Sequence, residues 1–547
     1  MSLSVACIGG GPGGLFAATL IKQRRPDARV TVYERNRADD TYGFGVVFSD
    51  ATLEKINAAD PVLIDALREH GTHWEDIEVR LKGERITVGG NGMAAISRKT
   101  LLLLLQDRAR AEGVDLRFET EVDVEEVLDT HDLVVASDGA NSRARERFAD
   151  QFGPSAVQAS AKFIWFGTSY MFDGLTFVHK EAPHGVFAVH GYPISEDVGT
   201  FIVETDEETW RRAGLDEFDV TQPPGPSDEK SRKYLEELFA DEIDGQPLLV
   251  NNSRWGNFRT RRAASWHAGR LALLGDSAHT AHFSVGSGTK MAMEDAIELA
   301  RAVAEHDDVE RALAAYEAAA RPSVEKIQGS ARPSLSWWEH FGRYHAAFDP
   351  TQFAFHFMSR SIGRAKIARR DPDFIAAVDA AWRARHGSDP LSTPLDLGEV
   401  TFPGRTARIV ERDGRRFVTD DGGAVVPLAE CPTALDGGST LDGGHAVAGG
   451  SALGKDEPWA LWLTAPETED GVAGAAAAVA ACRTERPALV AVHGGTPLTR
   501  VLLAEEARLA AGLPVALVEE QADEDRAATL VLSGRADLVA TAGGTGV

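Results

Sequence analysis

Three short apolar runs stand out in the first part of the chain, at residues 4–8, 132–136 and 270–274. Each run leads into a turn that contains glycine, and the segments after the first and third runs have the apolar spacing of helices. Buried strands that alternate with helices are typical of a sheet covered by helices. The pattern therefore predicts layered α/β structure in residues 1–150 and again in residues 260–330.

A different pattern fills residues 151–259, where apolar positions alternate or run together between turn residues. It is clearest in the segments FIWFGTSYMF, LTFVHK, GVFAVHGYP and GTFIVET. Such short patterned runs predict a β-sheet domain. Residues 331–395 follow a helical period instead and include an unusually aromatic stretch, PSLSWWEHFGRYH. We interpret this stretch as core or interface.

The chain ends in a second α/β pattern, which covers residues 396–547 and alternates strand and helix most clearly at 486–539. Only about 150 residues follow residue 395, whereas a complete (β/α)₈ barrel takes about 250. The stretch 437–454 is rich in glycine and predicts a loop. We therefore expect a degenerate α/β domain, a partial-barrel remnant, at the end of the chain.

The overall charge of the chain narrows the possible partners. With 83 acidic and 57 basic residues, the formal net charge is −26, which argues against a nucleic-acid-binding protein because such binding needs a basic surface. No apolar run is long enough to span a membrane, and the first residues lack the pattern of a signal peptide. We therefore expect a cytoplasmic protein without nucleic-acid or membrane partners, and a homodimer is possible.

The first apolar run opens a dinucleotide-binding pattern. Gly9, Gly11 and Gly14 form G-x-G-x-x-G between a predicted strand and a predicted helix, and Glu34 ends the next strand. The glycines allow a tight turn, a close approach of a pyrophosphate to the backbone, and close packing of helix on strand. An acidic residue at the distance of Glu34 can accept a hydrogen bond from a ribose hydroxyl. The pattern predicts dinucleotide binding but does not choose between FAD and NAD.

Two further motifs make that choice. Asp138 and Gly139 begin a D-G-x-x-S-x-x-R sequence after the second run, and Gly275-Asp276 follow the third. Together with the first motif, they make residues 1–330 resemble the single-component flavoprotein aromatic hydroxylases of the para-hydroxybenzoate hydroxylase type. The resemblance implies a Rossmann-like FAD-binding domain with a β-sheet substrate domain, FAD as cofactor, NADH or NADPH as reductant and O₂ as co-substrate.

The resemblance also implies which residues contact the flavin cofactor. The implied FAD-binding residues are Gly9, Gly11, Pro12, Gly13, Gly14, Glu34, Arg35, Val47, Arg98, Val122, Asp138, Asp276, Gly286, Gly288 and Thr289. Among these, Arg98 opens a predicted helix and would reach the FAD phosphates. The start of the helix near Thr289 would face the flavin and stabilise its reduced, negatively charged form.

The loop after Gly275 admits a second interpretation, because Asp276, His279 and His282 have the types and spacing of metal ligands. The flavin context favours a cofactor loop, so we expect no metal. One departure from the family is the absence of a proline at His282-Phe283-Ser284, where family members place one beside the flavin ring. This position is where we expect the chemistry specific to this subfamily.

Several stretches resemble the branch of the family that acts on CoA thioesters, among them NNSRWGNFRT (251–260) and HFSVGSGTKMAMEDAIELA (282–300). The resemblance implies 5-hydroxylation of an aromatic acyl-CoA, salicylyl-CoA (salicyloyl-CoA) to gentisyl-CoA, through a flavin C4a-hydroperoxide. The alternatives are 5-hydroxylation of 2-aminobenzoyl-CoA and a flavin halogenase or oxidase on the same fold. The segment GRADLV (534–539) resembles the FMN-binding part of an old yellow enzyme barrel, but the arginine expected after it is missing. We therefore predict no FMN site there.

A hydroxylase of this type must polarise or deprotonate the phenol of its substrate. We predict His282 as the catalytic acceptor because its loop should lie at the flavin ring and histidine has a suitable pKa. The predicted substrate-binding residues are His179, His190, Tyr192, Asn257, Arg259 and Phe283. For each histidine the alternative is an ordinary core or surface role.

Overall fold

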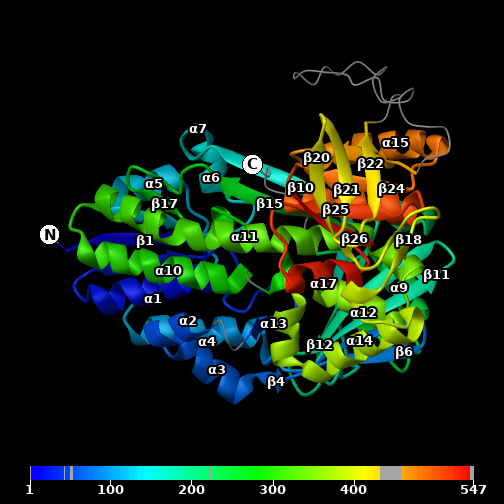
Figure 1. The fold of residues 1–547 in the computed structure, drawn as a ribbon. Helices are drawn as coiled ribbons and strands as arrows, with labels where there is room; N and C mark the ends of the chain where they lie inside the picture. The colour runs from blue at the N-terminus through cyan, green and yellow to red at the C-terminus, as the bar shows by residue number, and fades with distance from the viewer. Residues whose placement is uncertain are drawn as a thin grey trace. The chain divides into compact units, whose positions relative to one another are not determined.

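The computed structural model describes residues 2–41, 43–49, 53–221, 225–286, 288–430 and 458–542 (Figure 1). The chain divides into two units, Met1–Gly342 and Arg343–Val547. The glycine-rich stretch 437–454, predicted as a loop, lies outside the described residues. In the described part, no helix is both long and apolar enough to cross a membrane.

The three apolar runs of the sequence become neighbouring strands of one six-stranded sheet. In order across the sheet, its strands are β16 (His267–Ala268), β17 (Leu271–Leu273), β9 (Leu133–Ala136), β1 (Ser4–Ile8), β2 (Arg29–Tyr33) and β8 (Asp115–Arg117). All neighbouring pairs are parallel except β16 with β17. The predicted α/β layer is confirmed, and the loops after β1, β9 and β17 meet at one edge of this sheet, where parallel strands present their carboxyl ends.

Helix α1 (Pro12–Arg24) connects β1 to β2 and packs against α10 (Gly288–Glu305) and α4 (Arg98–Ala111) (Figure 1). Small residues allow the contact with α10, because a Cβ added at Gly13 would lie 2.7 Å from Leu274 Cδ2 and 3.0 Å from Ala292 Cβ. The first turn of α1 is thereby fixed beside the loop that precedes α10. The smaller helices of this region are α2 (Glu54–Ala59), α3 (Val62–His70), α5 (Val124–Thr130), α6 (Arg143–Arg147) and α7 (Ala149–Phe152).

The second sheet of the first unit is the predicted substrate-domain sheet, with one addition. Its order is β14 (Leu248–Leu249), β10 (Pro154–Thr168), β13 (Gly199–Thr205), β12 (Gly185–Pro193), β11 (Leu175–Ala182), β5 (Ile77–Leu81) and β6 (Glu84–Val88), and β15 (Gly256–Ala263) also pairs with β10. Strands β5 and β6 come from outside the predicted range 151–259, because β5 continues the sheet in parallel with β11. Helices α8 (Glu207–Arg212) and α9 (Glu229–Leu238) follow β13.

A small three-stranded sheet links the two large ones in sequence. It consists of β3 (Gly45–Ser49), β7 (Met93–Ser97) and β4 (Thr72–Trp74), and β7 leads directly into α4. Arg98 therefore stands at the junction of a strand end and a helix start.

The aromatic stretch of residues 333–345 falls within the long helix α11 (Val309–Ala347). Trp337, Trp338 and Phe341 are buried in the first unit, and their rings contact the imidazole ring of His179 on β11. The interpretation of these aromatics as core residues therefore agrees with the packing. Helices α12 (Pro350–Met358), α13 (Arg364–Arg370) and α14 (Pro372–His386) follow in the second unit.

The second unit contains a closed barrel of seven described strands, preceded by the short pair β18 (Leu395–Asp396) and β19 (Thr401–Phe402). The barrel strands are β20 (Thr406–Arg412), β21 (Arg415–Thr419), β22 (Val425–Ala429), β23 (Ala460–Thr464), β24 (Leu489–His493), β25 (Val515–Glu519) and β26 (Leu538–Ala542). Helices α15 (Val472–Cys482), α16 (Pro497–Glu505) and α17 (Glu524–Leu532) belong to its parallel part. The predicted remnant is therefore closed, because β20 to β22 form an antiparallel meander that bridges β26 and β23.

Candidate active site

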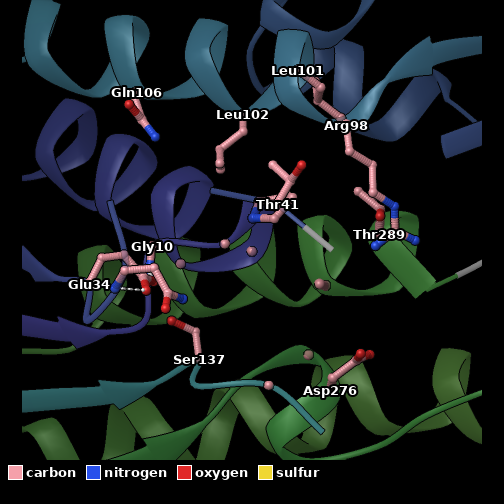
Figure 2. Close-up of a pocket in the computed structure, with 18 of the residues that line it drawn as sticks. Gly10, Glu34, Thr41, Arg98, Leu101, Leu102, Gln106, Ser137, Asp276 and Thr289 are labelled. Atoms are coloured by element: carbon pink, nitrogen blue, oxygen red, sulfur yellow. Dashed lines mark hydrogen bonds between the residues drawn. The ribbon is translucent and has the colours of Figure 1, made fainter. Parts of the chain in front are cut away.

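A cavity of about 330 Å³ lies where the loops after β1, β9 and β17 meet α4 and α10 (Figure 2). Its walls include backbone of the glycine loop, the acidic end of β2, polar groups of α4 and the first turn of α10. The lining residues include Gly10, Gly11, Pro12, Gly13, Gly14, Glu34, Asn36, Arg37, Arg98, Gln106, Ser137, Gly139, Asp276, Gly288 and Thr289. Three segments that are far apart in the sequence thus form a single site.

The glycine loop has the backbone geometry that a pyrophosphate cradle requires. Gly9 has a φ of +109°, and a Cβ there would lie 2.3 Å from the carbonyl oxygen of Ser137. At Gly14, a Cβ would lie 2.3 Å from the carbonyl oxygen of Gly9. A Cβ at Gly11, by contrast, would have no protein atom within 4 Å. Gly9 and Gly14 thus serve the packing of strand and helix, whereas Gly11 leaves space for an approaching group.

Glu34 holds the loop at its side of the cavity. Its Oε2 accepts a hydrogen bond from the Gly10 amide at 2.8 Å, drawn in Figure 2, and its Oε1 accepts one from the Asn36 amide at 2.8 Å. Arg35, predicted as an FAD contact, is exposed and is not among the lining residues, whereas Arg37 is. Glu34 and Arg35 both follow the end of β2 at Tyr33, so the direction of the Arg35 side chain is set by the turn after this strand.

Two other predicted cofactor residues lie behind the cavity wall. Asp138 Oδ2 accepts a hydrogen bond from the Arg143 amide at 2.8 Å, and its Oδ1 accepts one from the Ser277 hydroxyl at 3.1 Å. Asp138 therefore fixes its loop, and its neighbours Ser137 and Gly139 face the cavity. Val122 packs against the hydrophobic core and is not a lining residue.

The loop after β17 presents Asp276 to the cavity. His279 lies within hydrogen-bond distance of Asp295, with Nε2 and Oδ2 2.7 Å apart, and the same Oδ2 accepts a bond from the Gly275 amide at 3.0 Å. This contact uses the His279 side chain to hold the loop. Among the described residues, no group of three or more histidine, cysteine or acidic side chains has the arrangement of a metal site. Asp276, His279 and His282 thus have three different environments.

Arg98 and Asp276 supply opposite charges to the same cavity. The Arg98 side chain extends from α4 toward Thr289 (Figure 2), where its Nε donates to the Gly45 carbonyl at 3.1 Å. Burial lowers the pKa of Arg98, although Tyr192 and Asp276 act in the opposite direction. Burial raises the pKa of Asp276, and His279, Arg98 and Arg261 offset this only in part. Asp276 is exposed to the cavity, so a molecule that fills the cavity would strengthen this effect.

A second cavity, of about 310 Å³, adjoins the first and shares Arg98, Asp276, Gly288 and Thr289 with it. Five aromatic residues line it, namely Phe163, Trp165, Tyr192, Phe258 and Phe283. Of the predicted residues, Val47, Tyr192, Asn257, Arg259, Phe283 and Gly286 line this cavity. Arg261, which the sequence did not single out for this role, lines it as well.

The polar side chains of the second cavity differ in how many hydrogen bonds they already make to other protein groups. Asn257 is fully engaged, because its amide nitrogen donates to the carbonyls of Ala159 and Ser160 at 3.0 Å and its Oδ1 accepts from Lys162. These bonds span an irregularity in the register of β10 with β15. Burial raises the pKa of Tyr192, with Thr200 and Arg98 acting in the opposite direction, so its hydroxyl is protonated at neutral pH. Tyr192 is therefore a hydrogen-bond donor.

The three predicted histidines lie outside the lining of this cavity. His179 and His190 are buried against Trp338, and His282 is buried behind Phe283, with its ring centroid 4.2 Å from the phenyl ring. His282 Nδ1 lies 2.7 Å from the Ser284 hydroxyl. The geometry therefore does not support His282 as a direct contact of the substrate, because the Phe283 ring takes the position at the cavity wall.

A buried glutamate, which the sequence did not single out, lies beside two of these histidines. Glu204 on β13 lies between two of them, with Oε1 2.8 Å from His190 Nε2 and Oε2 3.9 Å from His282 Nε2. The side chains of Glu204, His190 and His282 are all buried. The predicted strand GTFIVET contains this glutamate, but only the pairing of β12 with β13 brings it beside His190.

The first cavity fits an anionic dinucleotide. It combines an open approach to the backbone at Gly11, the first turn of a thirteen-residue helix, an acidic acceptor at Glu34 and a guanidinium group at Arg98. Helix starts and guanidinium groups bind phosphates, and a carboxylate binds ribose hydroxyls. The second cavity, with aromatic walls and arginines, fits a flat ring that carries a polar or anionic group.

Comparisons with known proteins agree with this description. Residues 2–331 match a family described as the FAD binding domain. The chain is 58% identical over 546 residues to a salicyloyl-CoA 5-hydroxylase from Streptomyces sp, a match that covers 99% of this chain and 100% of that protein. It is also 38% identical over 331 residues to a 3-hydroxy-4-methyl-anthranilyl-(aryl-carrier protein) 5-monooxygenase from Streptosporangium sibiricum, covering 60% and 87% of the two chains.

Among solved structures, the chain is similar to a p-nitrophenol 4-monooxygenase from Pseudomonas putida DLL-E4. The TM-score is 0.52 at 18% identity, and the match covers 70% of this chain and 98% of the other. At this identity, the likeness concerns the fold alone.

Proposed function

Because the chain belongs to the FAD-binding-domain family and is a flavin-dependent monooxygenase, we propose that it hydroxylates salicyloyl-CoA at ring carbon 5. The observation that carries the proposal is the 58% identity over nearly the whole chain to a salicyloyl-CoA 5-hydroxylase. The two adjoining cavities support it, since one suits a dinucleotide and the other suits an aromatic ring. The product would be gentisyl-CoA.

We assign the first cavity to FAD. The backbone at Gly11 and the start of α1 would hold the pyrophosphate, Glu34 would bind a ribose hydroxyl, and Arg98 would reach a phosphate. Asp276 and the first turn of α10 at Gly288 and Thr289 border both cavities and would meet the flavin portion. The chemistry supplied by bound FAD is the transfer of electrons from NADH or NADPH and the activation of O₂.

The second cavity would orient the substrate ring and raise its electron density. Phe163, Phe258 and Phe283 would contact the ring and exclude water. The guanidinium groups of Arg98, Arg259 and Arg261 favour the ionised form of a phenol in this cavity, because opposite charges nearby stabilise the charged state. Tyr192 would donate a hydrogen bond to an oxygen of the substrate.

His282 fits a positioning role better than a catalytic one. It lies between Glu204 and Ser284, and the Ser284 hydroxyl is 2.9 Å from the Ser334 hydroxyl on α11. These contacts would hold the loop and thereby fix the Phe283 ring against the substrate. We expect His282→Ala to lower the rate without abolishing hydroxylation, and to leave its pH profile unchanged.

The alternative substrate is 2-aminobenzoyl-CoA, because one relative acts on an anthranilyl group. The cations of the second cavity favour the hydroxyl compound, since a neutral amine gains less from them than a phenol that can ionise. A halogenase or oxidase remains a weaker alternative. A halogenase would need a lysine above the flavin, and Lys290 in the first turn of α10 instead donates to Glu294, with Nζ and Oε1 2.7 Å apart.

The test compares salicyloyl-CoA, 2-aminobenzoyl-CoA and free salicylate with the purified flavoprotein. NADH and NADPH consumption and the hydroxylated product are measured for each compound. We expect gentisyl-CoA from salicyloyl-CoA and much slower product formation from the other two. Equal product formation from free salicylate would overturn the thioester assignment. The cytoplasmic location and the homodimer stay predictions, and size-exclusion chromatography with light scattering would test the dimer.

A further inference from the structure

A third cavity, of about 190 Å³, lies next to the substrate cavity. Its walls are Gly43, Arg98, Phe163, Trp165 and the loop 251–254 between β14 and β15. Arg98, Phe163 and Trp165 are also walls of the second cavity. The second and third cavities are therefore neighbours around these three residues.

The loop 251–254 has a fixed conformation. The Ser253 hydroxyl donates to the Trp165 carbonyl at 2.6 Å, and the Asn251 amide nitrogen donates to the Gly43 carbonyl at 3.0 Å. Asn252 has a φ of +54°, which is unusual for a residue other than glycine, and its Oδ1 accepts a bond from the Gly225 amide at 2.9 Å. The same oxygen accepts bonds from Arg254, with Nη2 at 2.6 Å and Nε at 3.1 Å. The loop thus holds the Arg254 guanidinium in a defined orientation at this cavity.

Apolar side chains are exposed beside the same loop. Val250 is 42% exposed and directly precedes it, and Val220 is 50% exposed. The Val220 carbonyl accepts a bond from Arg254 Nη1 at 3.4 Å, so the second valine is adjacent to the guanidinium group. Few large apolar residues of the described chain are this exposed. The two valines are therefore apolar groups that a ligand bound at this loop could contact.

We propose that the third cavity holds the pantetheine arm of the acyl-CoA substrate and that Arg254 binds its phosphates. The proposal rests on the proposed function and specifies how the thioester is recognised. A pantetheine arm combines amide groups with methyl groups and ends in a diphosphate. Each part has a matching group at this cavity: the side-chain amides of Asn251 and Asn252 for the amides, the two valines for the methyl groups, and the guanidinium group of Arg254 for the diphosphate.

Electrostatics favour the same assignment. The chain has a formal net charge of −26, so an anionic thioester needs a local cation for favourable binding. The third cavity has two arginines in its lining, and Arg98 also borders the cavity assigned to FAD. Arg254 is therefore the cation that distinguishes this cavity from the other two.

Two substrates of different length test the proposal. Salicyloyl-CoA carries the complete arm and phosphates, whereas salicyloyl-N-acetylcysteamine keeps the thioester and the first amide but lacks the phosphates. A lost charge-assisted contact corresponds to about a tenfold or larger loss of affinity. For Arg254→Ala, we expect KM for salicyloyl-CoA to rise by about tenfold or more with kcat nearly unchanged. We expect kcat/KM for the short thioester to stay at the wild-type value.

Two variants serve as controls. Arg254→Lys keeps the charge and should recover much of the affinity for salicyloyl-CoA. Arg211→Ala removes an exposed arginine of α8 that pairs with Glu207, and should leave both substrates unaffected. The flavin content of each variant, read from its visible absorbance, shows whether the first unit has folded and loaded its cofactor.

Three results would overturn the assignment. Equal effects of Arg254→Ala on both thioesters would indicate a structural role of the loop. An effect on KM for NADH in place of the thioester would assign the cavity to the reductant. No effect on either substrate would exclude Arg254 as the phosphate contact. Failure of the wild-type enzyme to hydroxylate either thioester would overturn the proposed function itself, and this outcome is distinguishable because it does not involve the variants.

Discussion

The two units of the protein use charged side chains in opposite ways. In the first unit, Arg98 and Asp276 face a cavity of about 330 Å³. In the second unit, Glu505 at the end of α16 is buried beside one imidazole and two guanidinium groups, with Oε1 3.1 Å from His356 Nε2 and 3.7 Å from Arg535 Nε, and Oε2 3.3 Å from Arg343 Nη2. The comparison shows that residues of the same chemical type serve a ligand in one place and the fold in the other.

The pKa shifts of the two carboxyl groups express this difference, whereas burial lowers the pKa of Arg98 and of Arg535 alike. Burial lowers the pKa of Arg98 and raises that of Asp276, so both groups are less favourably charged in the folded protein than in water. Burial would also raise the pKa of Glu505, but His356, Arg343 and Arg535 outweigh it and lower the value to about 2. The charges of the first site therefore lower the stability of the folded protein until a ligand compensates them. The cluster in the second unit stabilises the fold as long as all its partners are present.

The largest effect is expected when the cluster of the second unit is broken. Glu505→Gln leaves the buried guanidinium group of Arg535 without its carboxylate partner and leaves Arg343 paired with Glu506 alone, so the free energy of unfolding should fall by about 3–5 kcal/mol. Urea unfolding, combined with hydrogen exchange of peptides from the second unit, measures this fall in the free energy of unfolding. FAD affinity should stay at the wild-type value. A loss below about 1 kcal/mol, as for a surface ion pair, would contradict the structural role.

The glycine loop of the first unit offers a matched pair of substitutions. Gly9→Ala forces a side chain into a positive φ and toward the Ser137 carbonyl, so it should destabilise the first unit by about 1–3 kcal/mol. Gly11→Ala meets no protein atom within 4 Å, so the melting temperature of the apoprotein should be unchanged while FAD affinity falls. Thermal unfolding and FAD fluorescence titration separate the two. Normal FAD affinity in Gly11→Ala would contradict the assignment of this cavity to FAD.

The pH dependence of stability should arise mainly in the second unit. Burial and Arg535 lower the pKa of His356 to about 3, despite Glu505, so its neutral form is the one present in the folded protein. Because the unfolded state takes up the proton near pH 6.5, stability is complete above that pH and is lost as the pH falls toward the folded value. Between pH 7 and pH 5, we expect His356 to account for a loss of about 2 kcal/mol, which His356→Gln removes. Burial also lowers the pKa of His493, to about 4, so His493 adds a loss of its own that stays in this variant. Glu505 adds its own loss only below about pH 4.3. An equal loss in the variant would contradict this assignment.

The smallest effect on stability is expected at Asp276. Asp276→Asn removes a charge that burial disfavours, so the melting temperature of the apoprotein at neutral pH should stay unchanged or rise slightly. The flavin should bind more weakly or turn over more slowly, which a titration and an NADH oxidation assay measure. A clear fall in the melting temperature of the apoprotein would show that Asp276 serves the fold.

Most of the residues predicted to bind FAD line the first cavity, and the sequence could single them out because they lie in local motifs. Gly11, Glu34 and Asp276 follow directly from short patterns at the ends of strands, and the fold brings these strand ends together as expected. Arg35 is exposed and Val122 packs on the core, because a motif does not state which way a side chain points. The neighbours Arg37 and Phe118 line the cavity in their place.

The substrate side was harder to predict because it depends on contacts between distant strands. His282 lies in the loop beside the second cavity, but its ring is turned toward Glu204 and Ser284, and Phe283 faces the cavity. Glu204 carries no motif and becomes notable only through its pairing with His190. In the second unit, the partial barrel was predicted, but its closure depends on the register of β20 with β26.

The contrast between the two units is tested most directly by replacing one arginine in each. The measurement is the melting temperature of the apoprotein together with its dissociation constant for FAD, for Arg98→Met and Arg535→Met. For Arg98→Met we predict an unchanged or higher melting temperature and at least about tenfold weaker FAD binding. For Arg535→Met we predict a clearly lower melting temperature with FAD affinity unchanged. A destabilised Arg98→Met protein that binds FAD as tightly as the wild type would contradict the assignment of Arg98 to the cofactor.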